Sequence, residues 1–153
     1  MKKIILLFTL SFIGLNNVNA QNLDTIPETT NKFTVGIFQG GGSIVGFDFE
    51  QLITKNVGLS VGAGFLAYGA SVHYHFKPSI TSSSLAINYW HQGLGTSYVQ
   101  SVFGPSYVAK LSKRLSAQLG LGGIIDKGPL FSEAYKNTNE PDFLLIYSLG
   151  VYF

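Results

Sequence analysis

The sequence contains no cysteine and has few charged residues. Among its 153 residues, 12% are charged, 14% are aromatic and 18 are glycine. The absence of cysteine excludes disulfide frameworks and thiolate metal sites. Soluble domains usually have about a quarter charged residues, so this composition is unusual for a cytoplasmic protein. It is typical of a β-barrel surrounded by lipid.

The chain also lacks an excess of charge of either sign. Its formal net charge is +2, and Lys2 and Lys3 supply both units, so the remaining chain has a charge of 2 − 2 = 0. Proteins that bind nucleic acids obtain most of their affinity from basic residues that contact phosphates. We therefore expect no nucleic-acid partner.

The N-terminal segment has the pattern of an export signal. Lys2 and Lys3 precede an apolar stretch over 4–15, and a polar, small-residue segment ends at Ala20. This pattern predicts a signal peptide over 1–20, cleaved after Ala20. The alternative is a retained membrane anchor, but the apolar stretch is shorter than the ~20 residues that a spanning helix needs. The polar segment 21–31 is predicted to be a flexible periplasmic lead-in to one domain over 32–153.

The segment 57–65 (VGLSVGAGF) alternates apolar residues with glycine and serine. In a strand, successive side chains point to opposite faces of the sheet. A soluble antiparallel sheet would carry charged and polar side chains on its solvent face. Here the second face is too small and too weakly polar for that. The pattern instead favours a small barrel whose apolar face contacts lipid.

The alternation recurs about eight times, in segments near the length of a strand that crosses a bilayer. These segments are 32–39, 43–53, 57–65, 69–77, 82–90, 97–111, 115–125 and 143–153. Tight polar turns alternate with longer loops, as in outer-membrane barrels with short periplasmic turns. The sequence therefore predicts an all-β, eight-stranded antiparallel up-and-down transmembrane β-barrel with both termini in the periplasm. Pro105 predicts a bulge near Gly104.

These features resemble the small eight-stranded outer-membrane barrels of Gram-negative bacteria, of the outer-membrane protein A and X type. The resemblance rests on the export signal, the alternation over 32–153 and the ending YSLGVYF. It implies an integral outer-membrane location with contacts to membrane lipid and lipopolysaccharide. It also implies that Phe153, at the end of the last strand, is read by the barrel-assembly machinery.

Eight strands enclose a lumen that side chains can fill, so we expect no general diffusion pore. The small faces of 57–65 and 115–125 lie four places apart around the ring, which predicts a flattened lumen or a narrow cavity. A turn about Lys55 places Glu50 opposite Ser60, and a turn at 67–68 places Ser60 opposite His75. The inward polar residues are expected to form one lumen network: Asp48, Glu50, His73, His75, Lys77, Asn88 and Lys110.

The same residues have a catalytic interpretation. Ser84 beside His75, with Glu50 behind it, would provide a nucleophile, a base and an orienting acid. His91, expected at the rim where the fifth strand leaves the membrane, is a further candidate. The resemblance includes barrels that modify acyl chains of lipid A, so an acyl hydrolase or acyltransferase is the first alternative function. The favoured interpretation is a hydrogen-bonded plug of buried polar groups.

No metal or cofactor is expected. The three histidines lack the spacing of a zinc site. The glycines at 40–42 lack the lysine and helix of a phosphate loop, and are expected to form a tight, flexible hairpin turn. Outward tyrosines, among them Tyr68, Tyr89 and Tyr98, are candidates for the aromatic belts at membrane interfaces.

The longest loop, 126–142, is the candidate site for a surface partner. Its Leu130, Phe131 and Tyr135 are expected to form a small apolar contact surface on a helical turn. The leading hypothesis is a small, non-enzymatic outer-membrane barrel with a structural or surface-interaction role and a closed lumen. A lipocalin-like binder of small ligands is the second alternative, but it would require a polar exterior.

Overall fold

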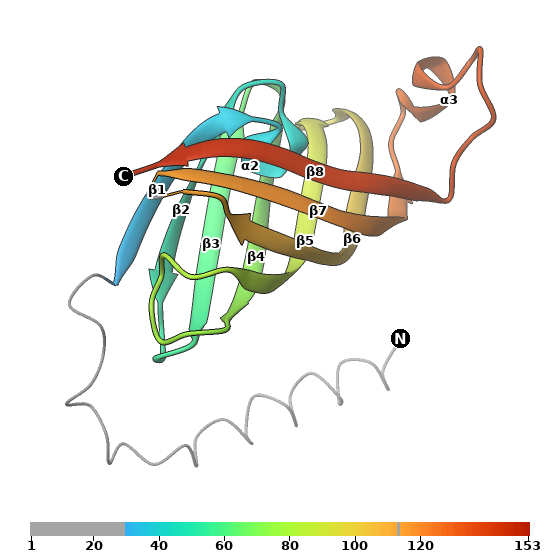
Figure 1. The fold of residues 1–153 in the computed structure, drawn as a ribbon. Helices are drawn as coiled ribbons and strands as arrows, with labels where there is room; N and C mark the ends of the chain where they lie inside the picture. Colours follow the sequence, from blue (N-terminus) through green and yellow to red (C-terminus); the bar gives the residue numbers. More distant parts are fainter. Residues whose placement is uncertain (1–29, 113) are drawn as a thin grey trace, which may run out of the picture.

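The computed structural model describes residues 30–112 and 114–153, and they form a closed antiparallel barrel (Figure 1). Each strand pairs with its neighbours in sequence, and β8 closes the ring against β1. The strands are β1 Asn31–Ile37, β2 Gly46–Leu52, β3 Val57–Gly64, β4 Ala67–His75, β5 Ser84–Leu94, β6 Ser97–Lys110, β7 Leu115–Lys127 and β8 Phe143–Tyr152. The predicted eight-stranded all-β barrel is confirmed. The predicted signal peptide and residues 21–29 of the lead-in lie outside the described residues.

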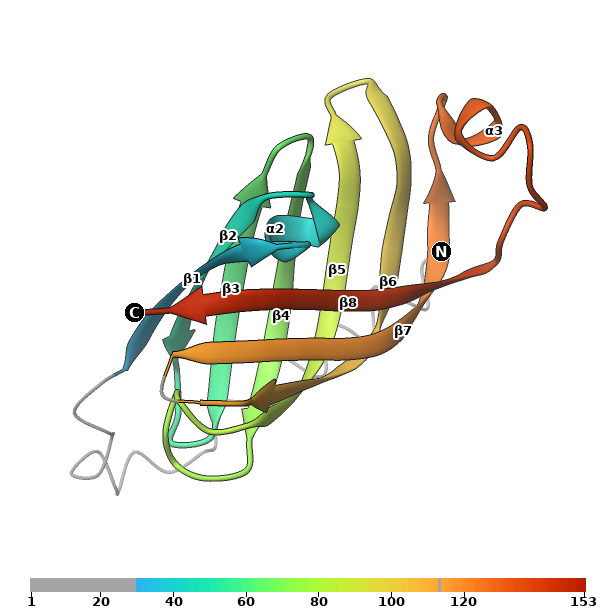
Figure 2. The same cartoon turned by 45° about the horizontal axis from the view of Figure 1, so that its top comes forward.

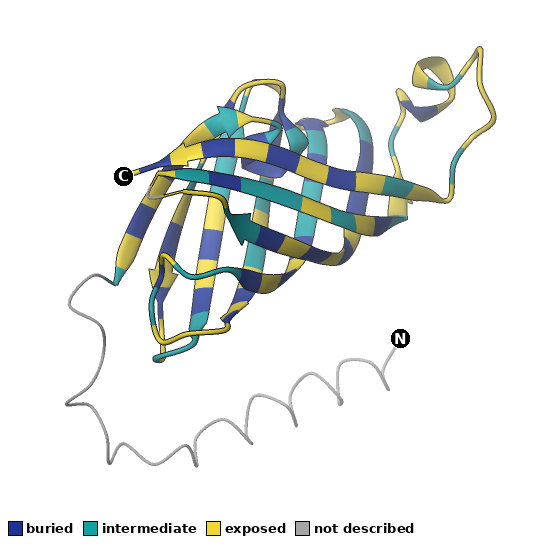
Figure 3. Ribbon diagram, viewed as in Figure 1, coloured by how far each residue is buried: buried dark blue, intermediate teal, exposed yellow. Residues whose placement is uncertain are grey.

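Side chains along each strand alternate between an exposed outer face and a buried inner face (Figure 3). On β3, Val61 is 60% exposed, whereas the adjacent Ser60 is 7% exposed. The same period of two along the other strands places most large apolar side chains on the outside. The barrel thus has an apolar exterior and a polar interior, as the sequence predicts.

The predicted bulge at Gly104 and Pro105 is wrong. The β5–β6 register passes through Pro105 without a shift, and the β6–β7 register is the same before and after it. Proline removes one donor from the ladder without adding a residue, so the strand continues past it. The register shifts lie nearer the loop end, between Gln92 and Gly93 on β5 and between Ser101 and Val102 on β6.

The connection between β1 and β2 folds into the barrel. It contains the short helical turn α2 (Gln39–Gly42), which contacts β1 to β5 and β8 (Figure 2). Gln39, Gly40 and Gly41 are buried. The tight turn expected from the three glycines is present, but it fills one end of the lumen. A second short helix, α3 (Phe131–Ala134), lies in the loop before β8, and no described helix is long and apolar enough to cross a membrane.

Glycine is required in α2 by both backbone conformation and space. Gly40 and Gly41 have positive φ angles of 62° and 83°. A Cβ atom at Gly40 would collide with the carbonyl oxygen of Ala63, and one at Gly41 with that of Tyr68. Positive φ costs an L-residue roughly 1–2 kcal/mol, and neither carbonyl can move without breaking the sheet. The glycines let α2 lie directly against the inner wall.

The small inner face of β3 provides the matching space. A Cβ at Gly64 would collide with the side chain of Ser43, and one at Gly62 with the carboxylate of Asp48. On β4, a Cβ at Gly69 would lie 3.0 Å from the Cα of Gly41. The glycines of 57–65 therefore make room for the plug formed by α2.

We expect Gly41→Ala to displace α2 from the lumen. Trp90, the only tryptophan, borders Gly42, so its fluorescence reports whether α2 is seated. Its emission should shift to the red and become more accessible to acrylamide. Gly95→Ala is the matched control, because Gly95 also has a positive φ but has nothing within 4 Å of an added Cβ. Equal fluorescence changes in the two variants would contradict this account of α2.

Candidate functional site in the barrel lumen

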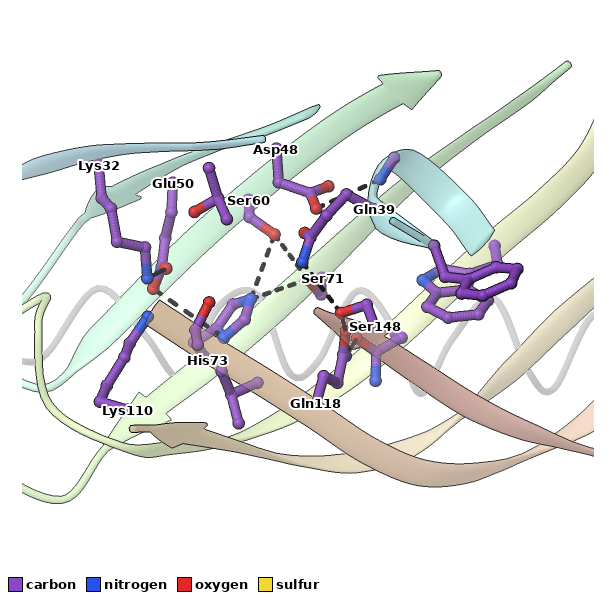
Figure 4. Close-up of a pocket in the computed structure, with 17 residues that line it drawn as sticks. Lys32, Gln39, Asp48, Glu50, Ser60, Ser71, His73, Lys110, Gln118 and Ser148 are labelled. Atoms are coloured by element: carbon purple, nitrogen blue, oxygen red, sulfur yellow. Dashed lines mark hydrogen bonds and ion pairs between the residues drawn. The ribbon is translucent and has the colours of Figure 1, made fainter. Parts of the chain in front are cut away.

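The lumen contains one polar cavity of about 40 Å³ beneath α2 (Figure 4). Its walls include Lys32, Asp48, Glu50, His73 and Lys110. A buried water needs roughly 10–15 Å³ of such space, so the cavity can hold a few waters but no organic ligand. Gln39 and Gly40 of α2 line this cavity together with inward side chains of the strands.

Glu50 on β2 is the centre of the charged part of the lumen. Its Oε2 forms an ion pair with Lys32 Nζ of β1, and its Oε1 lies 2.6 Å from His75 Nε2 of β4. The three side chains are 3%, 6% and 0% exposed. Gly58 of β3 lies between β2 and β4, and a Cβ there would be only 2.7 Å from Glu50 Oε1. Glycine at this position allows Glu50 to reach across β3.

The β2–β3 register is confirmed, but the predicted β3–β4 register is wrong. Glu50 pairs with Ser60 as expected. Ser60, however, pairs with Ser71 instead of His75. The turn falls at Phe65 and Leu66, two residues earlier than predicted, and this moves the pairing by four residues. The predicted proximity of Glu50 and His75 is nevertheless present, because the carboxylate passes over Gly58.

The predicted Ser84–His75–Glu50 catalytic row is not formed. Ser84 and His75 are strand partners, but the Ser84 hydroxyl lies 3.3 Å from Nδ1 of His73. His75 Nδ1 instead lies 3.2 Å from the carbonyl oxygen of Ser82. Ser84 is 1% exposed. Ser84 is thus buried inside the barrel and bonds to His73, while His75 pairs with Glu50.

The other predicted lumen residues take separate roles. Asp48 accepts a hydrogen bond of 3.2 Å from the N–H of Gly40 and so fastens α2. Lys110 Nζ lies 4.5 Å from the centre of the Tyr152 ring, a cation–π contact. Asn88 donates to the carbonyl of Gly104 at 3.1 Å.

Lys77 was wrongly predicted to face the lumen. It is exposed, because β4 ends at His75 and the chain then turns away from the barrel wall. Lys32, which sequence reasoning missed, supplies the positive charge instead. The sequence does indicate this position for Lys32, because in an alternating strand with Phe33 on the outer face, Lys32 faces inward.

Polar residues from α2, β7 and β8 extend the lumen network. Gln39 donates to Ser148 at 3.0 Å, Ser148 donates to Gln118, and Gln118 donates to Asn88 at 2.9 Å. This chain runs from the plug across three strands. In the described part of the chain, no buried side-chain nitrogen or oxygen lacks a hydrogen-bond partner. In residues 30–112 and 114–153, no three His, Asp or Glu side chains are grouped so as to hold a metal ion.

His91 does not occupy the rim position that the sequence predicts. The strand β5 continues to Leu94, so His91 lies within the sheet, on its outer face. It is only 8% exposed, because the rings of Tyr68 and Tyr98 cover it with centroids 4.7 Å away on either side. Its Nδ1 lies 2.9 Å from the hydroxyl of Ser101 on β6.

The three candidate contact residues of the long loop do not form one exposed surface. Phe131 is 2% exposed and packs against the ring of Tyr135, at 4.8 Å between centroids. The Tyr135 hydroxyl bonds with Gln100 on β6. Only Leu130, at 40% exposure, faces outward. The loop uses its apolar residues to fold over the end of β6, and this corrects the predicted surface.

No protein-family model matches the sequence, and neither the curated proteins nor the solved structures contain a significant match.

We expect Glu50→Ala to lower the free energy of unfolding by about 3–5 kcal/mol, because it leaves Lys32 buried without its counter-charge. Urea unfolding monitored by Trp90 fluorescence measures the change. Glu140→Ala removes the exposed ion pair with Lys127 and is the control. It should cost at most about 1 kcal/mol. Similar losses in the two variants would show that Glu50 does not organise the lumen.

Proposed function

We propose that the protein is a small integral outer-membrane β-barrel with a structural or surface-interaction role and a closed lumen. The observation that carries this proposal is the reversed polarity of the barrel. Its exposed face is covered by side chains such as Phe47, Leu59, Val61 and Leu121, while its buried face contains lysine, glutamate and histidine. This arrangement suits strands that face lipid outside and polar side chains inside.

Exposed apolar side chains occur on strands all around the ring. Outward residues on β1, β3, β5, β7 and β8 are each at least 39% exposed: Val35, Val61, Ile87, Leu119 and Leu145. Soluble monomers rarely expose contiguous apolar patches larger than a few hundred Å². A soluble lipocalin-like barrel would need the opposite arrangement, so the exterior argues against that alternative.

The interior argues for a structural role over transport or catalysis. The cavity of about 40 Å³ lies under α2 and has a wall of ion pairs and hydrogen bonds. The catalytic candidates Ser84 and His75 are 1% and 0% exposed. An acyl substrate in the surrounding membrane would have no contact with them. The loop end of the barrel, with its folded loop 126–142, remains the part offered to an external partner.

Val61→Lys distinguishes a membrane barrel from a soluble one, because the two predict different losses in the free energy of unfolding. A lysine on the lipid-facing side near the bilayer midplane costs about 2–4 kcal/mol. On a soluble protein, the same change at a 60% exposed site should remain within about 0.5 kcal/mol. Unfolding of the barrel reconstituted in phospholipid vesicles measures the difference.

Leu130→Lys is the matched control, since Leu130 is exposed in the loop outside the strands. It should leave stability unchanged. Fractionation gives an independent test: the wild-type protein should stay with the membranes after carbonate extraction. Release into the soluble fraction, or a tolerated Val61→Lys, would contradict the proposal.

A further inference from the structure

The connections at the loop end of the barrel differ in chemistry from one side to the other. The tip of the β3–β4 hairpin consists of Phe65 and Leu66, which are 72% and 53% exposed. In the neighbouring β1–β2 connection, Ile44 and Val45 are 68% and 59% exposed. The long β7–β8 connection instead carries exposed charged residues such as Glu140. We call Ile44, Val45, Phe65 and Leu66 the apolar tip surface.

The depth of this surface follows from counting outward residues from the tight-turn end of the barrel. On β3, the outward side chains from Val57 to Phe65 are all apolar, and the hairpin turns directly after them. On β6, an apolar run of the same length from Leu111 to Phe103 is followed by Ser101 within the strand. Both runs begin at a tight turn that a backbone hydrogen bond closes. Phe65 therefore lies at about the depth of Phe103.

Strand length places the apolar tip surface below the upper boundary of the lipid-facing band. At roughly 3.3 Å per residue and a tilt of about 40°, either run rises about 20 Å, whereas the apolar band of a membrane barrel is about 25 Å tall. The strands β5, β6 and β7 contain 11, 14 and 13 residues, against 8 in β3. They extend past the band, and there the paired residues His91, Ser101 and Asp126 are polar.

The backbone of the apolar tip surface has hydrogen-bond partners inside the protein. The N–H of Phe65 donates to the carbonyl oxygen of Val45 at 3.0 Å, which joins the two connections. The carbonyl oxygen of Phe65 accepts a bond of 2.7 Å from the hydroxyl of Ser43, which is 3% exposed. Hydrocarbon penalises every backbone group that lacks an internal partner. Both polar backbone groups of Phe65 meet this requirement.

We propose that the apolar tip surface lies among the acyl chains of the outer leaflet, so that the barrel reaches water at its loop end only on the side of β5, β6 and β7. The inference rests on the proposed membrane location and deepens it. The occupant is hydrocarbon, because the surface continues the outward apolar rows of β2 and β3 and has no charged or hydrogen-bonding side chain.

Single cysteines measure the depth of the apolar tip surface, because the chain has no cysteine of its own. A nitroxide spin label is attached to Phe65→Cys at the tip and to Val61→Cys in the middle of β3. Leu94→Cys is the matched control, since Leu94 is also apolar and 54% exposed but lies beyond His91 at the end of a long strand. Each barrel is placed in dioleoyl phosphatidylcholine vesicles. Collisions of the label with oxygen, which concentrates in hydrocarbon, and with a water-soluble nickel chelate are then compared.

We expect Phe65→Cys to resemble Val61→Cys, with frequent oxygen collisions and few nickel collisions. Leu94→Cys should show the reverse. Ile44→Cys repeats the test on the other connection, so the result does not depend on the folding of one variant. In thinner dilauroyl phosphatidylcholine bilayers, the label at position 65 should gain nickel collisions, whereas the label at position 61 should not.

Three results would overturn the inference. A Phe65→Cys label that resembles the Leu94→Cys label would place the apolar tip surface in water. A label shielded from both oxygen and nickel would mean that protein, such as a second copy of the chain, covers the tip. In both cases a Val61→Cys label in hydrocarbon leaves the membrane location intact. Frequent nickel collisions at Val61→Cys would overturn both proposals.

Discussion

The polar interior depends on the contacts that the Glu50 carboxylate makes with Lys32 and His75. The carboxylate lies between Lys32 of β1 and His75 of β4, and so joins the first four strands through a contact that crosses β3. A buried charge is tolerated only with partners that replace water. Glycine at position 58 leaves the carboxylate room to reach His75, because an added Cβ would lie 2.7 Å from Glu50 Oε1. The small inner face of β3 is thus a requirement of the charge cluster.

The same face also accommodates the plug. Gly62 leaves room for Asp48, which in turn bonds to the backbone of α2, and Gly64 leaves room for Ser43 at the end of α2. The hydrogen bond from Gln39 to Ser148 connects the plug to β8. One strand of alternating small residues therefore accepts two different inward groups, a charged cluster nearer the turns and a folded loop nearer the other end. The charged cluster around Glu50 and the plug α2 therefore both occupy the lumen next to β3.

The sequence was sufficient for the fold because a period of two assigns every strand residue to a face. It also gave the β2–β3 register, since Lys55 lies in a polar segment that signals a turn. It failed at the next turn, where Phe65 and Leu66 carry no such signal and Leu66 adopts a positive φ of 62°. The position and type of the turn set the register of a hairpin. When the turn residues are apolar, the register cannot be predicted from the sequence pattern.

The site was harder to predict than the fold, because its contacts depend on what covers a residue. The alternation in the sequence predicts a strand that ends at Trp90, which would put His91 at the rim. The strand continues to Leu94, and two tyrosines then enclose the histidine on the outer face of the barrel. Phe131 is a second example. An aromatic side chain in a long loop suggests a contact surface, but the loop itself buries Phe131. Strand periodicity predicts the face to which a side chain points, but it does not predict which other residues pack over that side chain.

The strands β5, β6 and β7 contain 11, 14 and 13 residues, against 7 in β1 and β2, so one side of the barrel extends beyond the other. His91 and Ser101 lie in this extension, close to the register shift on β6. Tyr98 pairs with Gly93 next to the β5–β6 register shift, and its ring packs against His91.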